Sequence, residues 1–131
     1  MARLGLLMLR QGQWRDRQII PAEWVRRSTS VRTSASEMHE PNLGYGYMWW
    51  VWEDTSGPFH GAFMATGSFG QFVTVLPELD MVVAHKTLPS GDVSVGNYGR
   101  LLGLLTGKKP ASADEMASWS HLPQKPSAPT K

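Results

Sequence analysis

The 131-residue sequence predicts an α+β fold in which antiparallel strands follow one another and helices flank them. Three observations lead to this prediction. The chain begins with two helix-like segments, continues with short apolar or aromatic runs separated by Gly and Pro turns, and then shows a closing apolar stripe at helical spacing. A chain of this length suits one ordinary domain, because it can bury roughly two-thirds of its unfolded surface.

Two helices are expected near the N-terminus. Residues 3–11 carry leucines and a methionine at helical spacing and are followed by glycine, which is a suitable helix stop. This segment is so apolar that we expect neighbouring elements to cover most of it. Residues 13–19 are polar and predict a loop. Pro21 then suits the first position of a short helix over residues 21–28.

Three or four consecutive antiparallel strands are expected in the middle of the chain. The aromatic run 45–52, YGYMWWVW, predicts one strand with both faces covered. Further strands are predicted over residues 59–65, 71–76 and 81–86, with a glycine-rich bend at 66–70. A tight Pro-containing turn predicts that the last two strands pair. The last strand begins with an apolar run, which favours a central position in the sheet.

A closing helix is predicted over residues 92–105, where apolar residues form a stripe before a glycine. The composition then changes to Pro, Ser, Ala and Lys over residues 108–131, which predicts a disordered tail. Residues 114–119 are compatible with a brief helical turn. The expected organisation is therefore one domain over residues 1–107 and a tail over residues 108–131.

Charge gives little support for nucleic-acid binding. The net charge is +2 and the pI is near 9.2, which is mildly basic. The early arginines are Arg10, Arg15, Arg17, Arg26, Arg27 and Arg32. We interpret them as a solvated face of the two-helix segment rather than a phosphate track, and we expect no nucleic-acid partner.

Several other classes of site are disfavoured. The chain has no cysteine, so disulfides and thiol catalysis are excluded. The histidines His39, His60, His85 and His121 lack metal-ligand spacing, and we expect neither a metal nor an organic cofactor. His85 is expected to be a satisfied strand residue rather than a catalytic base. No apolar run approaches the roughly 18 residues of a membrane span, and the N-terminus shows no signal peptide.

The segment of residues 65–68, Ala-Thr-Gly-Ser, is the strongest candidate for chemistry. It lies where a predicted strand meets a glycine bend, and glycine there lets a ligand approach the backbone closely. A free strand edge of this kind can offer N–H groups to a carbonyl oxygen. A plain hairpin with a glycine-rich turn explains the same residues, so local features leave both interpretations open.

A longer pattern favours the catalytic interpretation. The runs PAEWV, GYGYMWWV and FMATGSFGQFVTVLPELDMVVAHKT resemble the C-terminal portion of the serine β-lactamase and penicillin-binding-protein superfamily. The resemblance covers residues 2–105 and is greatest to the class C branch with its esterase and amidase relatives. It implies a partial β-lactamase/transpeptidase-like fold. It also implies that Ala65, Thr66 and Gly67 form a substrate-binding wall and that the backbone N–H of Ser68 completes an oxyanion hole.

The departures from the family pattern concern the catalytic machinery. No serine is followed by lysine three residues later, so the Ser-x-x-Lys nucleophile motif is absent, as is Tyr-x-Asn. Ala65 replaces the lysine of Lys-Thr-Gly, which would pair with a substrate carboxylate. We therefore expect a segment that is inactive alone and that, joined to the missing N-terminal part, acts on a neutral ester or amide.

The resemblance also implies that the chain is a fragment. Met1 is then an internal start, or the chain is the remnant of a split or truncated gene, and the sheet exposes an edge that the missing half would cover. Family members are often exported or periplasmic. The alternative function is a non-catalytic binding module or pseudoenzyme remnant, in which the aromatic run 45–52 supplies a stacking surface for a glycan or peptide.

Overall fold

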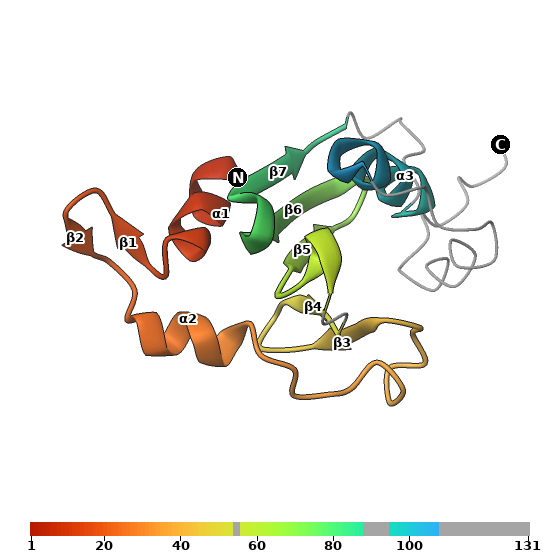
Figure 1. Ribbon diagram of the computed structural model, residues 1–131, viewed down its shortest axis with the longest axis horizontal. Helices are drawn as coiled ribbons and strands as arrows, with labels where there is room; N and C mark the ends of the chain where they lie inside the picture. The colour runs from red at the N-terminus through yellow and green to blue at the C-terminus, as the bar shows by residue number, and fades with distance from the viewer. Residues whose placement is uncertain (54–55, 88–94, 108–131) are drawn as a thin grey trace, which may run out of the picture.

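The computed structural model describes residues 1–53, 56–87 and 95–107, and Figure 1 shows how they are arranged. Helices α1 (Ala2–Leu9), α2 (Ala22–Ser28) and α3 (Val95–Thr106) accompany antiparallel sheets, so the fold class is α+β, as predicted. The first residues of the predicted closing helix, the tail over residues 108–131 and its helical turn at 114–119 lie outside the described residues.

The main sheet has five strands in the spatial order β3-β4-β5-β6-β7, and each neighbouring pair is antiparallel. The strands are β3 (Leu43–Tyr45), β4 (Trp50–Trp52), β5 (Phe63–Gly67), β6 (Gln71–Leu76) and β7 (Met81–His85). The 3₁₀ helices η1 (Gly57–Phe59) and η2 (Pro77–Leu79) precede β5 and β7 respectively. The predicted antiparallel pairing of the last two strands is confirmed, because Leu76 lies opposite Met81.

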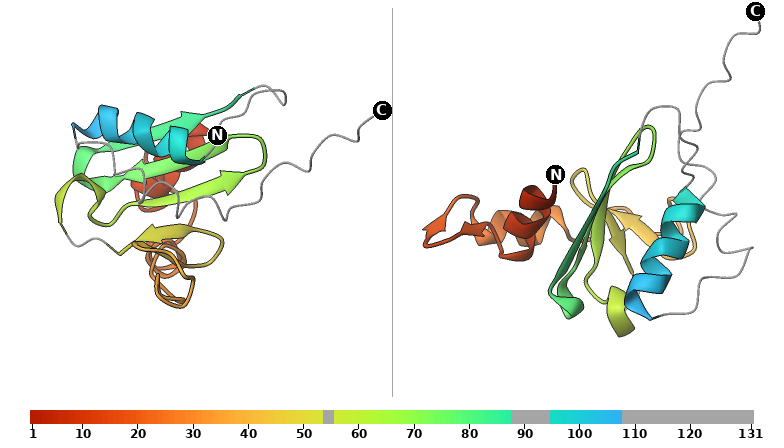
Figure 2. Two further views of the ribbon diagram at one scale, coloured as in Figure 1. Left: turned by 90° about the vertical axis from the view of Figure 1, so that its right-hand side faces the viewer. Right: turned by 90° about the horizontal axis from the view of Figure 1, so that it is seen from above.

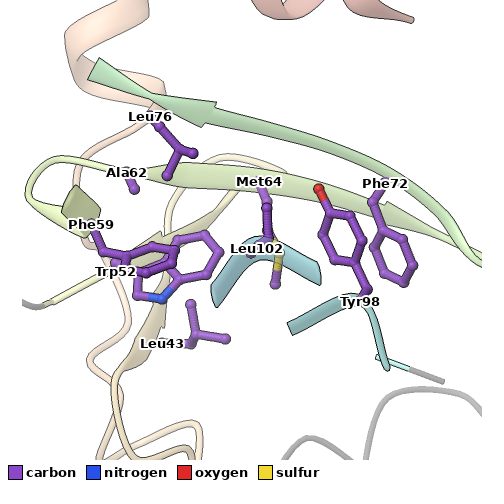
Figure 3. Packing of buried hydrophobic residues seen from close by; sticks show 9 residues of the cluster. All are labelled: Leu43, Trp52, Phe59, Ala62, Met64, Phe72, Leu76, Tyr98 and Leu102. Atoms are coloured by element: carbon purple, nitrogen blue, oxygen red, sulfur yellow. The ribbon is translucent and has the colours of Figure 1, made fainter. Parts of the chain in front are cut away.

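Helices cover both faces of this sheet, as the edge-on view in Figure 2 shows: α1 and α2 lie on one side and α3 lies on the other. The α3 side buries Leu43, Trp52, Phe59, Ala62, Met64, Phe72, Leu76, Tyr98 and Leu102 (Figure 3). The α1 side buries Met8, Val25, Trp49, Val51, Phe63 and Val75. The alternation of strand side chains between two apolar clusters explains why these strands have few polar positions.

Helix α1 packs closely on β6 and β7 through Gly5. A Cβ atom at this position would lie 2.5 Å from Cγ1 of Val82 and 3.0 Å from Cγ1 of Val73. The close packing does not bury the whole helix: Leu4 and Leu6 are 49% and 37% exposed. The expected cover on most sides of this helix is therefore not present in the described chain.

The prediction of one strand over residues 45–52 is wrong. Strands β3 and β4 form a hairpin, and Gly46 N–H donates to Trp49 O across a turn in which Met48 has a φ of 66°. A Cβ atom on Gly46 would lie 2.4 Å from Ser28 O, so glycine lets the turn approach the end of α2. The aromatic composition favoured a strand but concealed this reversal.

Three smaller expectations also need correction. The predicted loop over residues 13–19 contains a hairpin of β1 (Gln13–Trp14) and β2 (Arg17–Gln18). Strand β5 starts later than predicted and extends to Gly67, so Thr66 and Gly67 belong to the strand rather than to the bend. Within the described residues, strand β7 is the last strand of the sheet and not a central one; its side chains are apolar because both faces of the sheet are packed at this strand.

Candidate functional site

The end of β5 has one open edge. Strand β6 pairs with β5 over its whole length, from Phe63 to Gly67. Strand β4 pairs with only the first two residues, Phe63 and Met64. Beyond Met64, the side of β5 that faces β4 is therefore without a strand partner in the described chain.

The direction of the backbone N–H and C=O groups at this edge follows from the hydrogen bonds between neighbouring strands. Trp52 N–H donates to Ala62 O at 2.9 Å, so the polar backbone groups of Ala62 face β4. In an antiparallel strand both backbone groups of a residue point to one side, and successive residues alternate. Met64 and Thr66 consequently face the β4 side as well. Thr66 thus directs its N–H and C=O to the open edge. Ser68, two residues further on, is the next position in this alternation of backbone directions.

The predicted residues are accessible. Ala65 and Thr66 are half-buried, whereas Gly67 and Ser68 are exposed. Ala65 packs against the cluster on the α1 side, and Thr66 faces the opposite side because side chains alternate. The segment of residues 65–68 is therefore an exposed rim of the sheet and is not sealed inside a closed core.

Side chains from β7 and the residues after it hold the loop that follows this segment. His85 Nδ1 lies 2.8 Å from Gly70 O, and Thr87 Oγ1 donates to Phe69 O at 2.6 Å. Phe69 has a φ of 65°, which is uncommon for a residue other than glycine and marks a constrained loop. The half-buried His85 is thus a satisfied strand residue, and it anchors the loop next to the candidate amides. Sequence reasoning did not identify this anchoring, because it depends on the β6–β7 register.

The other sequence candidates do not join this segment. Arg10 pairs with Asp80 at 2.8 Å, Arg26 pairs with Glu23 at 2.7 Å, and Arg32 lies 5.3 Å from the ring centroid of Tyr47. Within the described ranges no group of three or more His, Asp or Glu residues is placed to hold a metal ion. In the same ranges no helix has the length and apolarity that crossing a bilayer requires.

An open pocket of about 500 Å³ lies at the other end of the sheet. It is lined by Ser56, Gly57, Pro58, His60, Glu78, Leu79 and Thr106. These residues come from the region before β5, from η2 and from the end of α3, whereas residues 65–68 are at the far end of β5. The pocket is therefore separate from the candidate wall.

Among the described residues, the pKa values of two groups are clearly shifted, and neither group belongs to the segment of residues 65–68. Burial raises the pKa of Tyr98 to about 12, although a hydrogen bond with Thr74 opposes the shift. Hydrogen bonds from Ser34 lower the pKa of the Glu37 carboxyl. Tyr98 stacks on Phe72 inside the α3-side core, so its shift reflects packing rather than catalysis.

Comparison with known proteins supports the superfamily. No family model and no curated protein matched the chain. A solved structure described as a putative 6-aminohexanoate-dimer hydrolase from Bacillus anthracis is similar, with 25% identity and a TM-score of 0.54. The similarity covers 82% of this chain and 28% of that chain. The structure has the β-lactamase and penicillin-binding-protein fold, so the similarity supports that superfamily of serine hydrolases for this chain.

Proposed function

We propose that this chain is the C-terminal segment of a β-lactamase-related serine hydrolase of the class C type, and that it supplies one wall of the active site but no nucleophile. The open edge at Thr66, with Ser68 next in the alternation, carries the proposal. Its support is the similar hydrolase structure, of which this chain spans 28%, together with the absence of Ser-x-x-Lys from the sequence.

The chemistry assigned to this wall is stabilisation of an oxyanion. When a serine supplied by the missing part attacks an ester or amide carbonyl, negative charge develops on the carbonyl oxygen. A backbone N–H aimed at that oxygen stabilises the tetrahedral intermediate, and removal of one such donor typically lowers kcat by about 10²–10³-fold. The constrained loop after Gly67 holds the Ser68 amide ready for this role without reorganisation.

The proposed substrate is a small neutral ester or amide. Ala65 carries no charge at the position where the resemblance implies a lysine, so nothing there pairs with a substrate carboxylate. The proposed reaction is acyl transfer to serine followed by hydrolysis, and no step of it calls on a metal or an organic cofactor.

An acyl-enzyme probe tests the inactive state of the chain alone. We expect no covalent labelling of the purified 131-residue protein by a fluorophosphonate or a penicillin probe, because no serine is activated by Ser-x-x-Lys. Stoichiometric labelling of any serine would contradict the proposal.

A complementation experiment tests the oxyanion role. If the genomic DNA upstream encodes a Ser-x-x-Lys segment, its co-expression with this chain should give esterase activity. Ser68→Pro, which removes the backbone N–H, should then lower kcat by about 10²–10³-fold, whereas Ser68→Ala should retain most activity. Equal loss in both variants would refute a main-chain role.

A non-catalytic binding module is the second candidate. Three residues of the aromatic run 45–52 belong to the core, since Trp49, Val51 and Trp52 are buried. However, Trp24 and Tyr47 are 48% and 41% exposed and stack with ring centroids 5.7 Å apart. Such a pair can bind a sugar ring or peptide. Unchanged tryptophan fluorescence on titration with soluble glycans and peptides would count against this binding function.

A further inference from the structure

The loop between β5 and β6 has the carbonyl group of each of its three residues held by a side chain. The contacts run from Gln71 Nε2 to Ser68 O (3.3 Å), from Thr87 Oγ1 to Phe69 O (2.6 Å) and from His85 Nδ1 to Gly70 O (2.8 Å). A carbonyl oxygen can only accept, so His85 carries a proton on Nδ1 in this contact. We call the three donors Gln71, His85 and Thr87 the carbonyl clamp.

The sheet register brings the clamp to the loop. His85 lies opposite Phe72, the second residue of β6, so the end of β7 lies beside the loop, and Thr87 follows two residues later. Gln71 lies opposite Gly67. A Cβ atom on Gly67 would lie 3.3 Å from Cβ of Gln71, so glycine leaves space for the Gln71 side chain at this end of the strand pair.

The peptide groups on either side of Ser68 are both held. The polar backbone groups of Ala62 face β4, so by alternation those of Gly67 face β6. In a planar trans peptide the C=O and N–H point in opposite directions, and the Ser68 N–H therefore points to the open side of β5. The next peptide group is held through Ser68 O by the Gln71 side chain.

The backbone of the loop is strained and depends on such contacts. Phe69 and Gly70 have φ values of 65° and 72°, in the left-handed region that glycine adopts freely and phenylalanine does not. A conformation of this kind persists only where the surroundings hold it. The short hydrogen bond from Thr87 is made to the carbonyl of the strained residue itself.

We propose that the carbonyl clamp positions the Ser68 amide, and that this donor is fixed within the present chain before the missing part joins it. The role rests on the hydrolase function proposed above, in which that amide stabilises the oxyanion. Gln71, His85 and Thr87 are positioning residues that act through the loop. A donor oriented in advance needs no reorganisation when charge develops, and a displacement of about 1 Å can lower the rate about 10²-fold.

Nuclear magnetic resonance relaxation of the 131-residue chain tests the clamp without the missing part. The amides of residues 68–70 should have order parameters of roughly 0.85, the value of rigid backbone. The double variant Thr87→Val, His85→Leu removes two donors and should lower these values below about 0.6. The matched variant Thr87→Ser, His85→Asn keeps a donor at each position and should stay rigid.

The amides of β6 serve as the folding control, because they should remain rigid in every variant. The single variant Thr87→Val, which keeps the shape of the side chain, should change the loop amides in the same direction as the double variant. Flexible amides at residues 68–70 in the parent chain would overturn the proposal. It is also overturned if the loop of a folded Thr87→Val, His85→Leu variant is as rigid as that of the parent.

Kinetics of the enzyme reconstituted by co-expression separate the clamp from the hydrolase function. Thr87→Val should lower kcat about tenfold with little change in KM, because the amide contact strengthens in the transition state, and Thr87→Ser should recover most of the loss. An unchanged kcat in Thr87→Val, beside a lowered kcat in Ser68→Pro, would refute the positioning role alone. If neither variant lowers kcat, the proposed oxyanion function fails and the positioning role fails with it.

Discussion

Backbone strain at single residues is concentrated in the turns that shape the sheet. Met48 combines a φ of 66° with a side chain that is 79% exposed, so its conformation is not compensated by burial. The position corresponds to the third residue of a turn that favours glycine. Phe69 has the same type of conformation, but its carbonyl is held by Thr87, which gives the loop beside the candidate amides a fixed geometry.

Met48→Gly should therefore stabilise the protein. Glycine adopts positive φ without the Cβ penalty, and little side-chain contact is lost at an exposed position, so we expect a gain of about 0.5–1 kcal/mol in the free energy of unfolding. Urea denaturation measures the change. Met48→Ala keeps the Cβ atom and serves as the control; a gain of the same size in this variant would contradict the strain argument.

Tyr98 should make stability depend on alkaline pH. Its pKa is raised from 10.0 to about 12, so between these values the unfolded chain loses the phenol proton while the folded chain keeps it. Stability from this residue is therefore complete below pH 10 and is lost as the pH rises toward 12, by on the order of 2 kcal/mol. Urea denaturation at several alkaline pH values would measure this loss.

The variant Tyr98→Phe separates this effect from other alkaline titrations. It should remove the Tyr98 part of the pH dependence while costing about 1–2 kcal/mol at neutral pH, because the buried Thr74 hydroxyl loses a partner at 2.6 Å. The stacking of Tyr98 on Phe72, shown in Figure 3, is preserved by phenylalanine. An unchanged alkaline slope in this variant would show that other groups dominate.

At the scale of elements, the docking of α1 on the sheet depends on the absence of one side chain. Gly5→Val would place a Cβ atom 2.5 Å from Val82 and add two methyl groups where β6 and β7 already contact the helix. We expect a loss of about 1–3 kcal/mol in the free energy of unfolding, measured by urea denaturation. Val82→Ala in the same chain should recover part of the loss. The exposed Arg3→Ala is the control and should be near neutral.

Prediction of the elements from sequence succeeded where local signals and tertiary packing agree. Strand β6 matches the predicted residues 71–76, because its alternating faces meet an apolar cluster on each side. The prediction of one strand over the aromatic run 45–52 was wrong, although Tyr, Trp and Val favour strands in general. The turn inside this run depends on Gly46, which lies close to Ser28 O, and on Met48 with its positive φ. Neither feature is visible in composition.

The candidate site was predictable only in part. The choice of residues 65–68 follows from a glycine-containing strand end and from the resemblance, and their role stays a prediction; the structure leaves Gly67 and Ser68 exposed. The roles of His85 and Thr87 were not predictable, since they come from a strand that is adjacent only after β6 and β7 pair. The position of β7 at the end of the described sheet was missed because packing on both faces makes a strand apolar whether or not it has a strand neighbour on each side.

At the scale of the whole molecule, one alternation of backbone directions relates the open end of β5 to the outer side of β7. The same ladder that turns Thr66 toward the open side of β5 turns Val82 and Ala84 toward the open side of β7. Strand β6, which lies between them, is buried over Phe72–Leu76 and pairs on both sides. In the part of the sheet that the structure describes, the centre is thus protected, whereas amides of β5 and of β7 face away from any strand partner.

Native-state amide hydrogen exchange should reveal this pattern across the sheet. The amides of Thr74 and Val75 should exchange only by global unfolding, because both neighbours and both faces of β6 are covered. Thr66 should exchange much faster than its neighbours Ala65 and Gly67, which face β6. Val82 and Ala84, which face away from β6, should likewise exchange faster than Val83, which faces β6. Thr66 protection equal to that of Ala65 would show that the edge of β5 is closed, because a hydrogen-bonded amide cannot serve an incoming carbonyl oxygen.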